Sequence, residues 1–238
     1  MLLIDEEDKL AAFLKNINEE MESVSCDERF VAVDTEFIRE HSKDPLLCLI
    51  QIATSSDVFI IDPMAVDVFP LRKLFENPNF RKVFHSAAQD LELLELAGIN
   101  TINNMYDTQL YESILSTDYC IGYQAIVFRY LNEKIEKDHR RSNWQKRPLD
   151  KNQLKYSTDD VFYLRKVYKS QLQKLQLLHR ENWLDEEELY LESNDVVPKK
   201  HDNQSDSIIL LKTLLEKCSQ SHQIARATIA TSRDLEKL

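Results

Sequence analysis

Two carboxylates stand two positions apart at the end of an apolar segment, Asp34 and Glu36 in the run RFVAVDTEF. The run is rich in β-branched and aromatic residues, which predicts a buried strand. Because side chains two apart on a strand point to the same face, both carboxylates would project from the sheet together. Crowded, desolvated acids are costly unless a cation lies between them, and such oxygen ligands suit Mg²⁺ or Mn²⁺. The pair alone is equally compatible with two acids that face water at a strand end.

Three more residues extend this pattern along the chain. Asp90, in HSAAQDLELL, follows a short predicted strand and stands at the start of a predicted helix. Tyr156 and Asp160, in LKYSTDDVFYL, are four apart on another predicted helix and therefore share one of its faces. The neighbouring Asp159 competes with Asp160 for the same role. Taken singly, an acid at a helix start complements the helix dipole, and a half-buried tyrosine beside solvated acids is ordinary.

The order of these groups gives them a joint interpretation. A DxE pair on the first strand, an aspartate opening a middle helix and a YxxxD pair on a late helix could converge on one cleft. They would supply four carboxylates and a phenol, which is the set of groups that two-metal phosphodiester hydrolysis needs. In that chemistry one cation activates water, and both stabilise the charge of the transition state.

The hydrophobic pattern predicts the elements that would position these groups. A helix is expected over residues 5–22, and three strands at 29–37, 46–53 and 58–61 would form a meander. Later segments add a strand at 82–85 and helices at 68–75, 87–97, 108–116, 122–132 and 150–178, with Asp107 as the cap of the helix at 108–116. Strands followed by strand–helix alternation predict an α/β protein whose mixed β-sheet is flanked by α-helices.

Composition and charge exclude several classes of protein. With only Gly98 and Gly122, the chain lacks the glycine-rich loop of a P-loop nucleotidase or a dinucleotide-binding Rossmann site. A formal charge of −11 argues against broad adhesion to nucleic acid or anionic membranes, although bound cations can reverse the field in an acidic cleft. The four cysteines lack zinc-ligand spacing, and no signal peptide or membrane-spanning run is visible, so a cytoplasmic protein with reduced thiols is expected.

The motifs together resemble the ribonuclease D family, within the DEDD exonucleases whose last motif carries a tyrosine. VAVDTEF is similar to the first family motif, HSAAQDLELL to the second and YSTDDVFYL to the third. Further likeness lies in PLLCLIQIA, VFIIDPM, YDTQL and SNWQKRPL, and the resemblance covers about residues 28–190. It implies a ribonuclease-H-like 3′–5′ exonuclease fold with a short helical C-terminal tail.

The resemblance also implies a role for each residue of the predicted site. Asp34 would bridge two metal ions, either Mg²⁺ or Mn²⁺. Glu36 and Asp160 would complete the first metal site, and Asp90 would help to hold the second through water. Tyr156 would hydrogen-bond the attacking water and aim it at the terminal phosphate, which suits a phenol because it stays protonated near pH 7.

A basic stretch, Lys137 to Arg147, precedes the YxxxD motif in this acidic chain. Its basic side chains could contact phosphate groups while its tryptophan stacks on a base, and the residues concerned are Arg140, Arg141, Trp144, Lys146 and Arg147. The alternative is a solvated loop that Trp144 anchors to the protein core. Phe37 and Gln51 are expected to line the substrate cleft, and His85 is expected to pack at a strand end.

Three segments are expected along the chain. Residues 1–192 would form the 3′–5′ exonuclease domain, and the polar residues 193–207 would form a linker. Residues 208–238 resemble part of the helical (HRDC-like) domain that follows the nuclease in this family. The segment is too short to form a stable bundle by itself.

The resemblance implies a metal-dependent exonuclease that releases 5′-mononucleotides from RNA 3′ ends, such as those of tRNA precursors or other structured RNA. A DNA exonuclease of the same mechanism, acting on single-stranded DNA, is an alternative because contacts to the 2′-hydroxyl cannot be read from sequence. A non-catalytic nucleic-acid-binding module is another alternative, although such a module would normally have lost a metal ligand. A structural adaptor acting through the C-terminal helices is a third. No membrane partner is expected, and the oligomeric state is left open.

Overall fold

The computed structural model describes most of the chain up to residue 180, namely residues 1–39, 44–118, 120–135, 142–180 and 219–220. Two compact units are present, Met1–Thr108 with Gln124–Tyr168 and Gln109–Tyr123 with Lys169–Leu238. The expected linker 193–207 lies outside the described residues, as does the expected C-terminal segment apart from Ser219 and Gln220.

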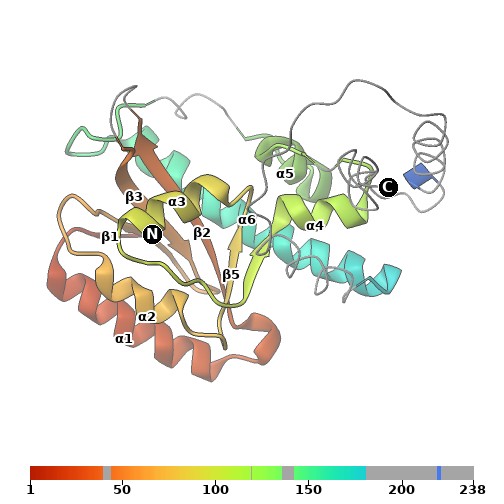
Figure 1. Cartoon of the computed structure of the whole chain (residues 1–238), viewed down its shortest axis with the longest axis horizontal. Coiled ribbons are helices and arrows are strands. Elements are labelled where there is room, and N and C mark those ends of the chain that lie inside the picture. The colour runs from red at the N-terminus through yellow and green to blue at the C-terminus, as the bar shows by residue number, and fades with distance from the viewer. Residues whose placement is uncertain (40–43, 119, 136–141, 181–218, 221–238) are drawn as a thin grey trace, which may run out of the picture. The chain divides into compact units, whose positions relative to one another are not determined.

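A single six-stranded sheet forms the centre of the first unit (Figure 1). Its strands, in the order β1-β4-β3-β2-β5-β6, are β1 (Leu2–Ile4), β2 (Phe30–Ile38), β3 (Leu46–Ala53), β4 (Val58–Ile61), β5 (Arg81–Phe84) and β6 (Met105–Asp107). β2 pairs antiparallel with β3, and β3 with β4, which confirms the predicted meander. The remaining pairings are parallel, so the sheet is mixed, as the sequence predicts.

The α-helices are α1 (Glu7–Ser23), α2 (Arg72–Phe75), α3 (Ala88–Leu96), α4 (Thr108–Leu115), α5 (Tyr123–Leu131) and α6 (Lys151–Leu178). The helix predicted at 68–75 is α-helical only in its second half, which is α2. Its first half is a 3₁₀ turn, Phe69–Leu71, whose second residue is a proline. The other helices begin and end within two residues of the predicted bounds. In the part of the chain that the structure describes, no helix has the length and apolar content needed to cross a bilayer.

One face of the sheet carries the hydrophobic core. Val31 and Val33 of β2 belong to a buried cluster that includes Leu10 and Phe13 of α1. The helix contributes these residues because its apolar positions recur at the 3.6-residue spacing that forms one stripe. This cluster fixes which residues of β2 face the core and therefore which residues face the opposite side.

Helix α6 covers the opposite face of the sheet. Its Tyr168 ring packs against Phe30 of β2, with ring centroids 4.6 Å apart, and against Tyr106 of β6 at 4.7 Å. The Tyr168 hydroxyl also accepts a hydrogen bond of 3.4 Å from Arg81 of β5. Since Phe30 shares its face of β2 with the residues at alternate positions, α6 is held against the strand face that carries Asp34.

One lysine is enclosed between two loops of this unit. Lys82 of β5 is fully buried, and its Nζ donates hydrogen bonds to the carbonyl oxygens of Asn77 (2.5 Å), Phe80 (2.8 Å) and Asn103 (2.7 Å). Burial lowers the pKa of Lys82 to about 8. The three carbonyl oxygens oppose this change because they stabilise the ammonium form. The side chain therefore links the loop before β5 to the loop before β6.

In the second unit, a buried polar contact joins α4 to the C-terminal part of α6. Gln171 Nε2 donates a hydrogen bond of 3.0 Å to Glu112 Oε2. Both side chains are fully buried, so each depends on this contact for part of its hydrogen bonding.

Candidate metal centre

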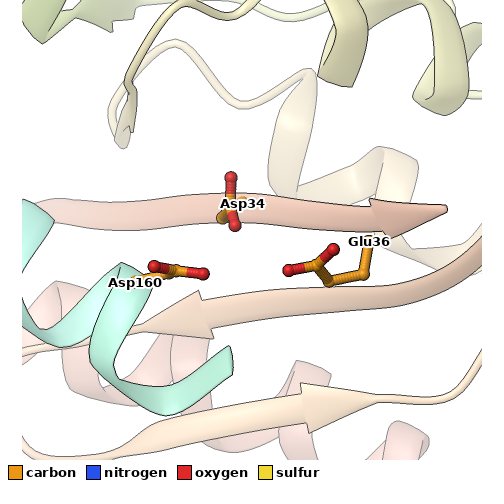
Figure 2. Close-up of side chains that lie close together, drawn as sticks. All are labelled: Asp34, Glu36 and Asp160. Carbon is orange, nitrogen blue, oxygen red and sulfur yellow. The ribbon is translucent and has the colours of Figure 1, made fainter. Parts of the chain in front are cut away.

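Three carboxylates meet between β2 and α6. Asp34 and Glu36 come from the strand and Asp160 comes from the helix, and Figure 2 shows their side chains converging. One oxygen atom of each carboxylate lies within 4.8 Å of those of the other two. That spacing allows the three oxygen atoms to bind one cation, and an all-oxygen donor set suits Mg²⁺ or Mn²⁺.

The sheet explains why the two strand acids point the same way. Asp34 stands opposite Gln51 of β3, and Glu36 stands opposite Leu49, so both acids lie on the face that α6 covers. The ladder is irregular directly after Glu36, between Glu36 and Phe37, so the regular alternation ends at the second acid.

Burial makes this site electrostatically unfavourable for bare carboxylates. Glu36 and Asp160 are each only 8% exposed. Burial raises the pKa of Asp34 well above its usual value, and the negative charges of Asp90, Asp160 and Glu36 raise it further. A divalent cation would favour the charged forms of all these acids, because it replaces lost hydration and offsets their mutual repulsion.

Asp90 stands beside this group, in the first turn of α3. It is 7% exposed, and its Oδ1 accepts a hydrogen bond of 2.5 Å from the Thr35 hydroxyl. Burial raises the pKa of Asp90 to about 7, although the bond from Thr35 lowers it. Thr35 was not identified from the sequence. Its signal is its place between two acids on a strand, because alternation sends its hydroxyl to the opposite face.

Tyr156 lies one helical turn before Asp160 and is half-buried. Its ring centroid is 6.0 Å from that of Trp144, with the ring planes tilted by 43°. Trp144 is only 1% exposed, so it has no free face for a nucleobase. This burial corrects the expected stacking role of Trp144 and favours the alternative, in which the tryptophan anchors its loop to the core. Trp144 therefore supports Tyr156 from inside the protein.

The side chain of Arg147 forms hydrogen bonds within the protein. Its guanidinium donates hydrogen bonds of 2.5 and 2.7 Å to the two carboxylate oxygens of Asp62, which follows β4. Further bonds reach the carbonyl oxygens of Cys48 (2.9 Å) and Trp144 (2.7 Å). These contacts correct the expected phosphate-binding role of Arg147. The residue instead ties the loop before α6 to the sheet, and with it the start of the helix that carries Tyr156.

The other residues expected to contact nucleic acid differ in their surroundings. Lys146 is exposed, and Phe37 is half-buried with the Arg39 guanidinium carbon 5.7 Å from its ring centre. Gln51 is fully buried, and neither polar atom of its side chain has a hydrogen-bond partner among the described residues. This enclosure corrects the expectation that Gln51 lines the substrate cleft. Arg140 and Arg141 lie outside the residues that the structure describes.

Comparison with known proteins agrees with this geometry. Residues 3–176 match a family model described as 3′-5′ exonuclease. The chain belongs to this exonuclease family. Within the family, ribonuclease D of Sphingobium indicum is 39% identical over 161 residues, which are 66% of this chain and 42% of that protein. Ribonuclease D of Zymomonas mobilis is 41% identical over 161 residues, which are 66% of this chain and 41% of that protein. The resemblance to ribonuclease D is confirmed, and the chain spans less than half the length of these relatives.

Two solved structures share the fold of this chain. The structure of Escherichia coli RNase D, described as an exoribonuclease involved in structured RNA processing, matches with a TM-score of 0.71 at 22% identity. That match covers 98% of this chain and 64% of the other. Brucella melitensis NrnC matches with a TM-score of 0.59 at 25% identity and covers 72% of this chain and 91% of the other. The predicted ribonuclease-H-like 3′–5′ exonuclease fold is therefore confirmed.

Proposed function

We propose that this chain is a metal-dependent 3′–5′ exoribonuclease that removes 5′-mononucleotides from RNA 3′ ends. The observation that carries the proposal is the convergence of Asp34, Glu36 and Asp160 within 4.8 Å in a chain of the 3′–5′ exonuclease family. Ordinary structural acids do not explain this convergence, because three crowded carboxylates repel one another unless a cation is present. The choice of RNA, including tRNA precursors or other structured RNA, rests on the ribonuclease D relatives.

The carboxylates fit hard divalent cations. Asp34, Glu36 and Asp160 would hold one Mg²⁺ or Mn²⁺ ion, and Asp34 with Asp90 would hold a second, the latter through water. Bound ions would supply Lewis-acid stabilisation of the negative charge that develops on the phosphate. The hydrogen bond from Thr35 favours the ionised form of Asp90, which is the form that a cation requires.

Tyr156 would orient the attacking water. Its place one turn from Asp160 puts both residues on one face of α6, and its phenol can donate or accept a hydrogen bond at neutral pH. Packing against the buried Trp144 restricts the ring, and the Arg147–Asp62 ion pair holds the loop that carries the tryptophan. Such support matters because a misdirected nucleophile lowers the rate even when the substrate is bound.

Contacts to the nucleic acid would come from residues at the surface. Lys146 can attract phosphate groups, and the half-buried ring of Phe37 with Arg39 can stack on a base near the acids. Arg140 and Arg141 are proposed to add phosphate contacts. A cytoplasmic location is proposed with this function.

The test uses the full chain and a 5′-labelled RNA with a single-stranded 3′ extension, incubated with Mg²⁺, with Mn²⁺ and with EDTA. We expect stepwise shortening from the 3′ end that EDTA stops, with 5′-mononucleotides as the product. Asp34→Asn should abolish shortening while circular dichroism shows an unchanged fold. Asp8→Asn, which alters an exposed acid on α1, is the matched control and should retain activity.

Two other outcomes separate the alternatives. Faster shortening of a DNA oligomer of the same sequence would favour the DNA exonuclease. Retention of labelled RNA without shortening under either metal, by protein that unfolds cooperatively, would favour the non-catalytic binding module. Activity that survives Asp34→Asn would remove the proposed metal site altogether.

A further inference from the structure

The turn between β5 and α3 leads directly to Asp90 and lacks a cap of its own. The N-cap residue of α3 is Ala87, whose side chain has no oxygen atom to accept hydrogen bonds from the first backbone N–H groups of the helix. The preceding residue, Ser86, has φ of 61°, in the left-handed region that residues other than glycine seldom adopt. Something outside the turn must therefore hold this backbone in place.

Asp107 of the neighbouring strand supplies the missing acceptors. Its Oδ1 accepts a hydrogen bond of 2.9 Å from the Ser86 backbone N–H, and its Oδ2 accepts one of 2.8 Å from the Ala87 N–H. The strand pairing explains why the Asp107 side chain reaches this turn, because β5 and β6 are parallel and Phe84 stands beside Asp107 in the register. Both strands end at the same edge of the sheet, where the turn begins.

The next residue reinforces the same turn. The Thr108 hydroxyl donates a hydrogen bond of 3.0 Å to the carbonyl oxygen of Phe84 and lies 2.9 Å from His85 Nδ1. The residues from Phe84 to Ala87 are thus held by two consecutive side chains at the end of β6. Asp90 stands three residues further on, within the first helical turn, so its place depends on where that turn starts.

We propose that Asp107 is a positioning residue that fixes Asp90 through the β5–α3 turn and thereby sets the affinity of the second cation position. The inference rests on the proposed function, because it assumes that Asp90 helps to bind a cation. Asp107 is distinct from the metal ligands, since each of its carboxylate oxygens already accepts a backbone N–H. Its negative charge is nevertheless close enough to raise the pKa of Asp90.

The decisive variant is Asp107→Asn, because the amide keeps the size of the carboxylate but turns one acceptor into a donor that faces a backbone N–H. Binding of Mn²⁺ alone to the full chain, followed by electron paramagnetic resonance, is compared for the wild type, Asp107→Asn, Asp90→Asn and the double variant. Loss of a residue that orients a metal ligand lowers metal affinity by about 10- to 100-fold. We expect at least about a tenfold loss in Asp107→Asn, and no further loss when Asp107→Asn is added to Asp90→Asn.

A purely structural role predicts a different pattern. If Asp107 only stabilised the fold, its replacement would lower the melting temperature in both backgrounds while Mn²⁺ affinity stayed unchanged, and that result would overturn the proposal. Asp67→Asn is the matched control, since Asp67 also accepts a backbone N–H, from Phe69, in a turn outside the acid cluster. It should leave Mn²⁺ binding unaltered.

Hydrogen exchange on the unmodified chain gives a test that does not depend on how the variant folds. The Ser86 and Ala87 amides should exchange slowly if Asp107 holds them, and fast exchange at both would contradict the proposal. Failure of the proposed function has a separate signature. If Asp90→Asn binds Mn²⁺ as tightly as the wild type, Asp90 is no ligand. If Asp90→Asn weakens binding and Asp107→Asn does not, only the positioning role is lost.

Discussion

Replacement of Asp90 by asparagine should stabilise the metal-free protein, and more at pH 8 than at pH 5. The carboxyl group has its pKa raised from 3.8 to about 7, mainly by burial and further by the charge of Asp107. An acid whose pKa is raised by folding keeps its proton up to a higher pH in the folded state than in the unfolded state. The stability of the wild type therefore falls as the pH rises from about 4 to about 7, because the unfolded chain ionises first.

The size of the effect follows from the shift. Three pKa units at 1.36 kcal/mol each correspond to about 4 kcal/mol of destabilisation by ionised Asp90 at pH 8. At pH 5 the group remains protonated in the folded state, and the cost is only about 1.6 kcal/mol. Asparagine cannot ionise, and its amide oxygen can still accept the hydrogen bond from Thr35. The variant should therefore remove most of this cost without losing that contact.

Urea unfolding of the wild type and of Asp90→Asn in EDTA, at pH 5 and at pH 8, measures the difference in free energy of unfolding at each pH. Asp8→Asn is the control, because an exposed acid should change the free energy of unfolding by no more than about 0.5 kcal/mol at either pH. Addition of Mn²⁺ should reverse the order, since only the wild type keeps the full ligand set. A gain of equal size at the two pH values, or destabilisation by Asp90→Asn at pH 8, would refute the reasoning.

Three further substitutions test the surroundings of the site. Lys82→Met should lower the free energy of unfolding by about 2 kcal/mol or more, measured in urea, because three carbonyl oxygens, one of them buried, lose their donor; an unchanged urea midpoint would mean that water replaces the ammonium. Gln51→Leu should raise the free energy of unfolding by about 1–3 kcal/mol, since it removes a buried amide that has no hydrogen-bond partner among the described residues; calorimetry showing a loss of stability would reveal a partner. Tyr156→Phe should lower kcat for RNA hydrolysis by at least about tenfold while Mn²⁺ affinity stays within about twofold; equal losses of both would make the tyrosine structural.

Periodicity in the sequence predicts the long elements of the fold. The strand that carries Asp34 and the helix that carries Asp160 both have clear patterns, so the sharing of faces by the acids follows from spacing alone. Strands β1 and β6 were missed. Each has three residues, too few to show alternation, and each exists because it pairs with a strand distant in sequence. Such pairing is a tertiary effect that local pattern does not encode.

The basic stretch shows the same limit at the level of side chains. Arg147 and Trp144 have the composition of a nucleic-acid contact, yet one binds Asp62 and the other is buried against Tyr156. Asp62 lies 85 residues before its partner, so no local signal connects the two. An arginine next to a site can bind the substrate or hold the loop that carries the site, and only the fold distinguishes these uses.

Strand β2 serves two purposes that cannot be changed separately. Val31 and Val33 pack into the core on one face, while Asp34 and Glu36 place their carboxylates on the other face. A larger or smaller residue at either valine would shift the strand, and the distances among the acids would change with it. Attempts to make this protein more heat-resistant by redesigning its core would therefore also change the spacing of its clustered carboxylates. Stabilising substitutions are better sought on the exposed face of α1, where sequence can vary without moving the strand.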